Sequence, residues 1–295
     1  MKKNTIFTGA ATALVTPLTA EGIDYASFER LIEFQIAGGI DALVVCGTTG
    51  EGSTLSDDEH REAISFVVNK VAGRVPVIAG TGSNDTDYAI DLTRHACEAG
   101  ADAMLVVTPY YNKATQKGLV KMYGAIADAS EKPIILYNVP TRTGVGIAPA
   151  TYAELADHPN IVAAKEANGD FSKIAETLAL VGDKLDFYSG NDDQIVPMLS
   201  LGGKGVISVL SNIMPRETHD ICELFFKGDV AASAQLQLKL LPLINTLFCE
   251  VNPIPVKAAV SAMGYGEDYL RLPLTNLEDA HREKLYALMR EQGLI

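Results

Sequence analysis

Short apolar segments recur along the chain, and each one leads through a polar loop into an amphipathic segment. The apolar segments are rich in β-branched and small residues, which is typical of buried strands. Eight of them precede residue 210: Thr8–Thr16, Ala42–Cys46, Val75–Ala79, Ala103–Val107, Pro133–Tyr137, Ile161–Lys165, Asp186–Ser189 and Gly205–Val209.

The segments between these strands have apolar residues at helical spacing. In Tyr25–Ala37, for example, Phe28, Leu31 and Ile32 share one face. The other predicted helices are Asp57–Val71, Asn84–Ala99, Gln116–Ser130, Pro149–Asp157, Phe171–Val181, Asp192–Leu201 and Pro215–Lys227. Three helices are followed by a glycine, which predicts a left-handed cap at Gly38, Gly100 and Gly182.

Strands that alternate with helices imply a parallel sheet. Eight such units predict an α/β fold, a (β/α)8 TIM barrel over residues 1–227. A doubly wound open sheet is the alternative, but no G-x-G-x-x-G motif follows the first strand to mark a dinucleotide site.

The strand pattern stops after Lys227. Three helices are predicted there, at Val230–Val251, Pro253–Met263 and Leu277–Gln292. Residues 228–295 are therefore expected to form a small C-terminal helical domain that covers the barrel surface or an oligomer interface.

Charge and composition narrow the range of partners. The net charge of −13 argues against nucleic acids and anionic membranes, and an anionic substrate would need local cationic groups. The four cysteines form no C-x-x-C pair, which favours free thiols in a reducing cytoplasm. The histidines lack metal-binding spacing, so no metal is expected. No organic cofactor is expected either, because a protonated imine on a lysine can itself stabilise developing charge.

Lys165 is the most unusual residue of the strand pattern, because lysine is rarely buried without a partner. Successive strand residues alternate between faces, so Glu166 need not neutralise it. One interpretation is a desolvated amine that attacks a carbonyl and forms a Schiff base. The other is a lysine at a strand end that reaches into water.

In a (β/α)8 barrel, active-site residues gather at the carboxyl ends of the strands. Gly47-Thr48-Thr49-Gly50-Glu51 follows the second strand and offers hydroxyls and backbone N–H groups to a carboxylate, although a plain turn would look the same. Tyr137 ends the fifth strand as Lys165 ends the sixth. A phenol beside an amine can transfer protons during imine formation, although a single Tyr is more often core.

These motifs together resemble the pyruvate-dependent class I aldolase superfamily, and within it the dihydrodipicolinate synthase family. The resemblance rests on G-T-T-G-E at 47–51, Y-N-V-P-T-R-T-G at 137–144 and the strand that contains Lys165, and it extends to the segment 252–257. It implies condensation of pyruvate with aspartate semialdehyde, at the first committed step of diaminopimelate and lysine synthesis.

The resemblance also implies roles for individual residues. Lys165 would form the Schiff base, Tyr137 would act as acid and base, and Thr48 would relay protons between Tyr137 and Tyr111. Thr49 would contribute to binding of the pyruvate carboxylate, and Arg142 would bind the semialdehyde carboxylate. Gly190 and Ile207 would line the pocket through their backbones.

Two alternatives remain at this point. One is another aldolase or dehydratase of the superfamily, such as an N-acetylneuraminate lyase or a 2-keto-3-deoxy sugar acid aldolase. Arg142, and Thr48 where sugar-acid lyases usually have serine, favour the synthase. The other is a barrel that binds a keto acid without catalysis, which the set of Lys165, Tyr137 and Thr48 disfavours.

The family resemblance further implies a homotetramer of two dimers, in which Tyr111 enters the neighbouring subunit. Many relatives are inhibited by lysine bound at the dimer interface. His60, Asn84 and Tyr110 match that site, but Gly52, Asp57 and Tyr88 do not. A carboxylate for the effector's amine is missing at Tyr88, so weak inhibition by lysine is expected.

Overall fold

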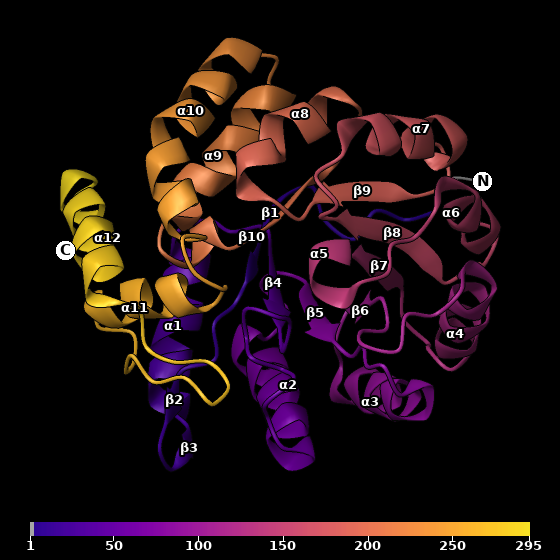
Figure 1. Cartoon of the computed structure of the whole chain (residues 1–295), viewed down its shortest axis with the longest axis horizontal. Helices are drawn as coiled ribbons and strands as arrows, with labels where there is room; N and C mark the ends of the chain where they lie inside the picture. Colours follow the sequence, from indigo (N-terminus) through magenta and orange to yellow (C-terminus); the bar gives the residue numbers. More distant parts are fainter. Residues whose placement is uncertain (1–2) are drawn as a thin grey trace.

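Eight parallel strands close into a barrel in the computed structural model, which describes residues 3–295 (Figure 1). The strands follow one another around the barrel, and β1 pairs with both β4 and β10 to close it. This confirms the predicted (β/α)8 fold. The strands are β1 (Gly9–Ala13), β4 (Ala42–Val45), β5 (Val77–Gly80), β6 (Ala103–Val107), β7 (Ile134–Asn138), β8 (Ile161–Glu166), β9 (Asp186–Ser189) and β10 (Gly205–Ser208).

The helices surround this barrel (Figure 1). Between consecutive strands, and after β10, lie α1 (Tyr25–Ala37), α2 (Asp57–Val71), α3 (Thr86–Ala99), α4 (Gln116–Asp128), α5 (Pro140–Thr143), α6 (Pro149–Leu155), α7 (Phe171–Val181), α8 (Ile195–Ser200) and α9 (Pro215–Phe226). A small hairpin, β2 (Leu18–Thr19) and β3 (Gly22–Ile23), precedes α1, and 3-10 turns, η1 (Asp192–Gln194) and η2 (Leu210–Asn212), precede α8 and α9. Within residues 3–295 no helix has the length and apolar character needed to cross a bilayer.

The strands divide the apolar residues into two cores, because successive side chains point to opposite faces. Outward-facing residues such as Leu43 and Val106 pack against the helices. Inward-facing residues such as Val44, Ile135 and Ile207 fill the barrel. At one end of the interior Phe7 stacks on Tyr188 with ring centroids 4.2 Å apart, so the barrel interior is packed with side chains rather than open.

A bulge in β8 changes which side chains point inward. Ile134 of β7 pairs with Ile161, but Ile135 pairs with Ala163, so Val162 is an extra residue in β8. Val162 and Ala163 both belong to the inner core. Because one inserted residue reverses the alternation beyond it, the bulge places Lys165 inside the barrel.

Three more helices follow the barrel: α10 (Val230–Thr246), α11 (Ile254–Ala262) and α12 (Asp279–Glu291). Helix α10 packs against α8 and α9, and α12 packs against α10 and α11. Helix α10 thus continues the outer layer beside α8 and α9 (Figure 1). The segment after α11 contacts α1, where the ring centroids of Phe34 and Tyr265 lie 4.9 Å apart.

The predicted left-handed caps are correct at only one of three glycines. Gly100 has a φ of 91°, but Gly38 and Gly182 are right-handed. At Gly38 a Cβ atom would lie 2.4 Å from Cγ of Pro215, and at Gly182 it would lie 2.7 Å from the Leu178 carbonyl oxygen. Close packing, not a left-handed backbone, explains these two glycines.

Candidate active site

Lys165 and Tyr137 lie opposite each other on neighbouring strands. They are register partners in the β7–β8 pair, and Nζ of Lys165 lies 4.4 Å from the centroid of the Tyr137 ring. Both side chains point into the barrel, with exposed fractions of 6% and 7%. The predicted juxtaposition of amine and phenol is therefore present.

Among residues 3–295 no carboxylate lies within 4.0 Å of the Lys165 amine. Burial raises the pKa of the Asp192 carboxyl, and the charge of Lys165 acts against that shift. Glu166 points to the outer face, where it accepts hydrogen bonds from Nδ2 of Asn138 and from the Tyr152 hydroxyl, at 3.0 and 2.9 Å. Burial raises the pKa of the Glu166 carboxyl. The alternation of β8 thus separates the carboxylate from the amine, as expected from the sequence.

The loop after β4 carries Thr48 and Thr49 and is fixed at its end by Glu51. Cys46 and Glu51 have φ angles of 55° and 53°, which non-glycine residues seldom adopt. The buried Glu51 carboxylate forms an ion pair with Lys257 of α11 and accepts a 3.1 Å hydrogen bond from the Arg271 backbone. The segment after the barrel therefore holds this loop in its conformation.

Arg142 lies on α5, a helix of four residues directly after β7. Its Nη2 donates a 3.2 Å hydrogen bond to the carbonyl oxygen of Asn252, while the side chain remains accessible to solvent. This segment was expected to be a loop. Pro140 at the helix start and Gly144 after its end are the local signals that would have predicted the helix.

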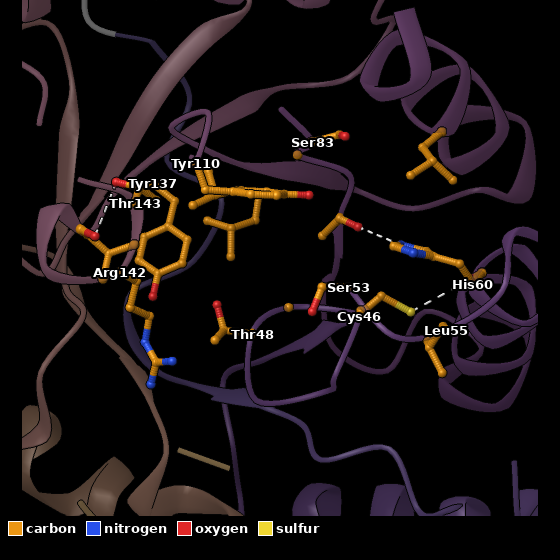
Figure 2. A pocket seen from close by; sticks show the side chains of 18 of the residues that line it. Cys46, Thr48, Ser53, Leu55, His60, Ser83, Tyr110, Tyr137, Arg142 and Thr143 are labelled. Atoms are coloured by element: carbon orange, nitrogen blue, oxygen red, sulfur yellow. Dashed lines mark hydrogen bonds between the residues drawn. The ribbon is translucent and has the colours of Figure 1, made fainter. Parts of the chain in front are cut away.

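A cavity of about 390 Å³ opens at the carboxyl ends of the strands. Thr48, Tyr137 and Arg142 line one end of it, and His60 lies at the other (Figure 2). Lys165 and Thr49 are not part of the cavity wall. The Lys165 amine lies over the Tyr137 ring, and Thr49 is 2% exposed beside Asn252. Thr48 and Tyr137 lie at the same end of the cavity but are not joined by a hydrogen bond (Figure 2).

Gly190 directly follows β9 and Ile207 lies on β10, and neither residue is part of the cavity wall. The Gly190 N–H donates a 2.8 Å hydrogen bond to the Glu166 carbonyl oxygen. A Cβ atom at Gly190 would lie 2.7 Å from Cβ of Ala167, so a larger residue would push β8 and β9 apart. Ile207 points into the barrel opposite Ala11 of β1.

Tyr111 projects away from its own barrel. Its side chain is 91% exposed and its φ angle is 73°, whereas the preceding Tyr110 lines the cavity. Tandem tyrosines thus point in different directions, as predicted. Such an exposed aromatic side chain is available to a second subunit.

The cavity is also lined by four of the positions that the resemblance linked to an effector: Gly52, His60, Tyr88 and Tyr110. Burial, and then the neighbouring Asp57, raise the pKa of the Tyr88 phenol to about 12. Burial lowers the pKa of His60, which favours the neutral form of this ring. The Asp57 carboxylate is already paired with Arg61 at 2.9 Å.

The sequence predicts no role for the side chains of Asn252, Glu51 or Lys257. Asn252 contacts Thr49 and Lys257 contacts Glu51 across about 200 residues of sequence, which no local pattern reveals. A lysine inside the apolar helix α11 is the one local signal. Among residues 3–295 no group of three or more His, Cys, Asp or Glu side chains is placed to hold a metal ion.

Comparisons with known proteins agree with this geometry. The model of the dihydrodipicolinate synthetase family matches residues 6–292. A 4-hydroxy-tetrahydrodipicolinate synthase from Clostridium perfringens is 53% identical over 290 residues, which cover 98% of this chain and all of the relative.

Solved structures show the same similarity. The dihydrodipicolinate synthase of Thermotoga maritima superimposes with a TM-score of 0.97 at 43% identity, covering 99% of this chain and 100% of that one. The enzyme of Cyanidioschyzon merolae, solved with lysine bound, has a TM-score of 0.94 at 39% identity, with 99% and 100% covered. Both the sequence and the barrel therefore show that the chain belongs to the dihydrodipicolinate synthetase family.

Proposed function

We propose that this protein is a 4-hydroxy-tetrahydrodipicolinate synthase, a lyase that condenses pyruvate with aspartate 4-semialdehyde through a Schiff base on Lys165. The observation that supports this most is the buried Lys165 amine, which lies 4.4 Å from the centroid of the Tyr137 ring and forms no ion pair among the described residues. The name shared by the relatives agrees with it. The reaction supplies material for diaminopimelate and lysine synthesis.

The chemistry begins when the Lys165 amine attacks the ketone of pyruvate. Tyr137 donates a proton as the carbinolamine loses water, which leaves an iminium. The iminium withdraws electrons, so a methyl proton is lost and an enamine forms. The enamine attacks the aldehyde, and the substrate's amino group then attacks the imine carbon, closes the ring and releases Lys165. These steps use side chains of the protein alone.

The remaining residues bind the substrates and move protons. Arg142 is accessible at the cavity and presents a guanidinium to the carboxylate of the semialdehyde. Thr49, with backbone groups of Gly190 and Ile207, would bind the pyruvate end. Thr48 would relay protons between Tyr137 and Tyr111 of a second subunit. A local cation such as Arg142 is needed to bind an anionic substrate, because the net charge of the protein is −13.

We also propose a homotetramer built from two dimers, in the cytoplasm. The exposed Tyr111 side chain supports an exchange between dimer subunits. Residues 1–227 would form the catalytic barrel and residues 228–295 a helical domain. The contacts of Asn252 and Lys257 with the barrel loops give this second domain a part in holding the site.

A comparison of two reactions tests the proposal. The purified enzyme should condense pyruvate with aspartate semialdehyde and should not cleave N-acetylneuraminate or a 2-keto-3-deoxy sugar acid at a comparable rate. Cleavage of a sugar acid with the higher kcat/KM would instead assign the chain to the rival activity. Arg142 favours the first outcome, because a planar guanidinium suits a second carboxylate.

A further inference from the structure

Asn252 contacts two loops of the site at once. Its Nδ2 donates a 3.0 Å hydrogen bond to Oγ1 of Thr49, and its backbone oxygen accepts one from Nη2 of Arg142 at 3.2 Å. Asn252 lies between α10 and α11 and is 5% exposed. One buried residue thus joins the loop after β4 to the loop after β7.

The direction of the hydrogen bond to Thr49 matters for ligand binding. A hydroxyl donates one proton and accepts through two lone pairs. Because the Asn252 amide donates to this oxygen, the Thr49 proton is free to point elsewhere, and it has no acceptor among residues 3–295. Oδ1 of Asn252 also has no hydrogen-bond partner among these residues, so it does not accept a hydrogen bond from the Thr49 hydroxyl. A bound carboxylate would supply the missing acceptor.

The loop backbone is held by other contacts. Glu51 is anchored to Lys257 and to the Arg271 backbone, whichever residue occupies position 252. The Arg142 contact uses the Asn252 carbonyl oxygen, which every substitution retains. The side chain of Asn252 therefore orients the Thr49 hydroxyl, whereas other contacts fix the positions of Thr49 and Arg142.

We propose that Asn252 is a positioning residue that makes the Thr49 hydroxyl a hydrogen-bond donor to the pyruvate carboxylate, while its backbone holds Arg142 for the second carboxylate. This inference rests on the proposed substrate assignments of Thr49 and Arg142. It identifies a residue of the C-terminal segment that links the binding of both substrates.

The test substitutes Asn252→Asp, which keeps the shape but replaces the donor with an acceptor. The new carboxylate would accept a hydrogen bond from the Thr49 hydroxyl, and its charge would repel the pyruvate carboxylate. The pyruvate concentration for half-maximal borohydride trapping should rise at least about tenfold, because the hydrogen bond from the Thr49 hydroxyl to the charged pyruvate carboxylate is lost. The KM for the semialdehyde should change less. The ratio of the half-saturation concentration for trapping in the variant to that in wild type should fall as the pH is lowered, because the carboxyl introduced at position 252 can, once protonated, again donate a hydrogen bond to Thr49.

Two further variants make the result decisive. Thr49→Val removes the hydroxyl and should raise the same half-saturation concentration. If it does so while Asn252→Asp stays within about twofold of wild type, the inference about Asn252 is overturned but the proposed site stands. If Thr49→Val changes nothing, the Thr49 assignment itself fails. Should Asn252→Asp not fold, Asn252→Leu must show the rise without the pH-dependent relief, and a normal half-saturation concentration would reject the proposal.

Discussion

Tyr137 and Lys165 face each other inside the barrel because of a single extra residue in β8. The bulge at Val162 reverses the alternation of the strand, and the two residues then become register partners with the amine 4.4 Å from the ring centroid. Without that insertion Lys165 would point toward the helices and Glu166 toward the cavity. The nucleophile proposed for the reaction therefore depends on a local irregularity of the sheet.

Replacing Arg142 with alanine tests the binding of the second substrate. Arg142→Ala should raise the KM for aspartate semialdehyde at least about tenfold and lower kcat, because a charged hydrogen bond of roughly 1.5–3 kcal/mol is lost. The pyruvate imine should still form. Arg290→Ala, on the exposed face of α12, is the matched control and should behave as wild type. An unchanged semialdehyde KM in Arg142→Ala would reject the assignment.

Mixing two inactive variants tests whether Tyr111 acts across subunits. Lys165→Ala and Tyr111→Phe should each be nearly inactive alone. In a mixed dimer with reciprocal exchange, one site carries both defects and the other carries neither. After dissociation and reassembly, activity should recover to about a quarter of wild type, since half the dimers are mixed and half their sites are intact. If heterodimers form without any recovery, Tyr111 does not complete the neighbouring site.

Inhibition by lysine should be weak. The cavity presents the Tyr88 phenol where the family resemblance implies a carboxylate in lysine-sensitive members, and Asp57 is already paired with Arg61. An effector ammonium therefore lacks a free anionic partner there. Steady-state rates over a lysine titration would check this, and Tyr88→Glu should increase sensitivity. Half-inhibition of the wild type at submillimolar lysine would show the prediction to be wrong.

The buried ion pair between Lys257 and Glu51 should be important for stability. Lys257→Met leaves the Glu51 carboxylate buried without its cation, which should lower the free energy of unfolding by about 3–5 kcal/mol. The double variant Lys257→Met with Glu51→Gln removes the unpaired charge and should recover part of that loss. Denaturant unfolding measures both values. A single variant as stable as wild type would show that the pair does not hold the loop.

Much of the fold follows from the sequence, but the site follows only in part. The eight strands and most helices come from hydrophobic periodicity, which is local. Lys165 points into the barrel because of the bulge at Val162, which the hydrophobic pattern does not reveal. Small residues such as Ala163 and Ala164 suit either face of the strand. The contacts of Asn252 and Lys257 with the barrel loops depend on tertiary packing across about 200 residues. Tertiary contacts of this kind have no periodic signature.

The Schiff base on Lys165 is the central claim, and borohydride trapping tests it most directly. Incubation with pyruvate and borohydride should add the mass of a reduced pyruvyl group to the peptide that contains Lys165. Lys257, which is also buried but paired with Glu51, is an internal control and should remain unmodified. Lys165→Met should abolish labelling. Labelling of another lysine in the wild type, or of none, would contradict the proposed mechanism.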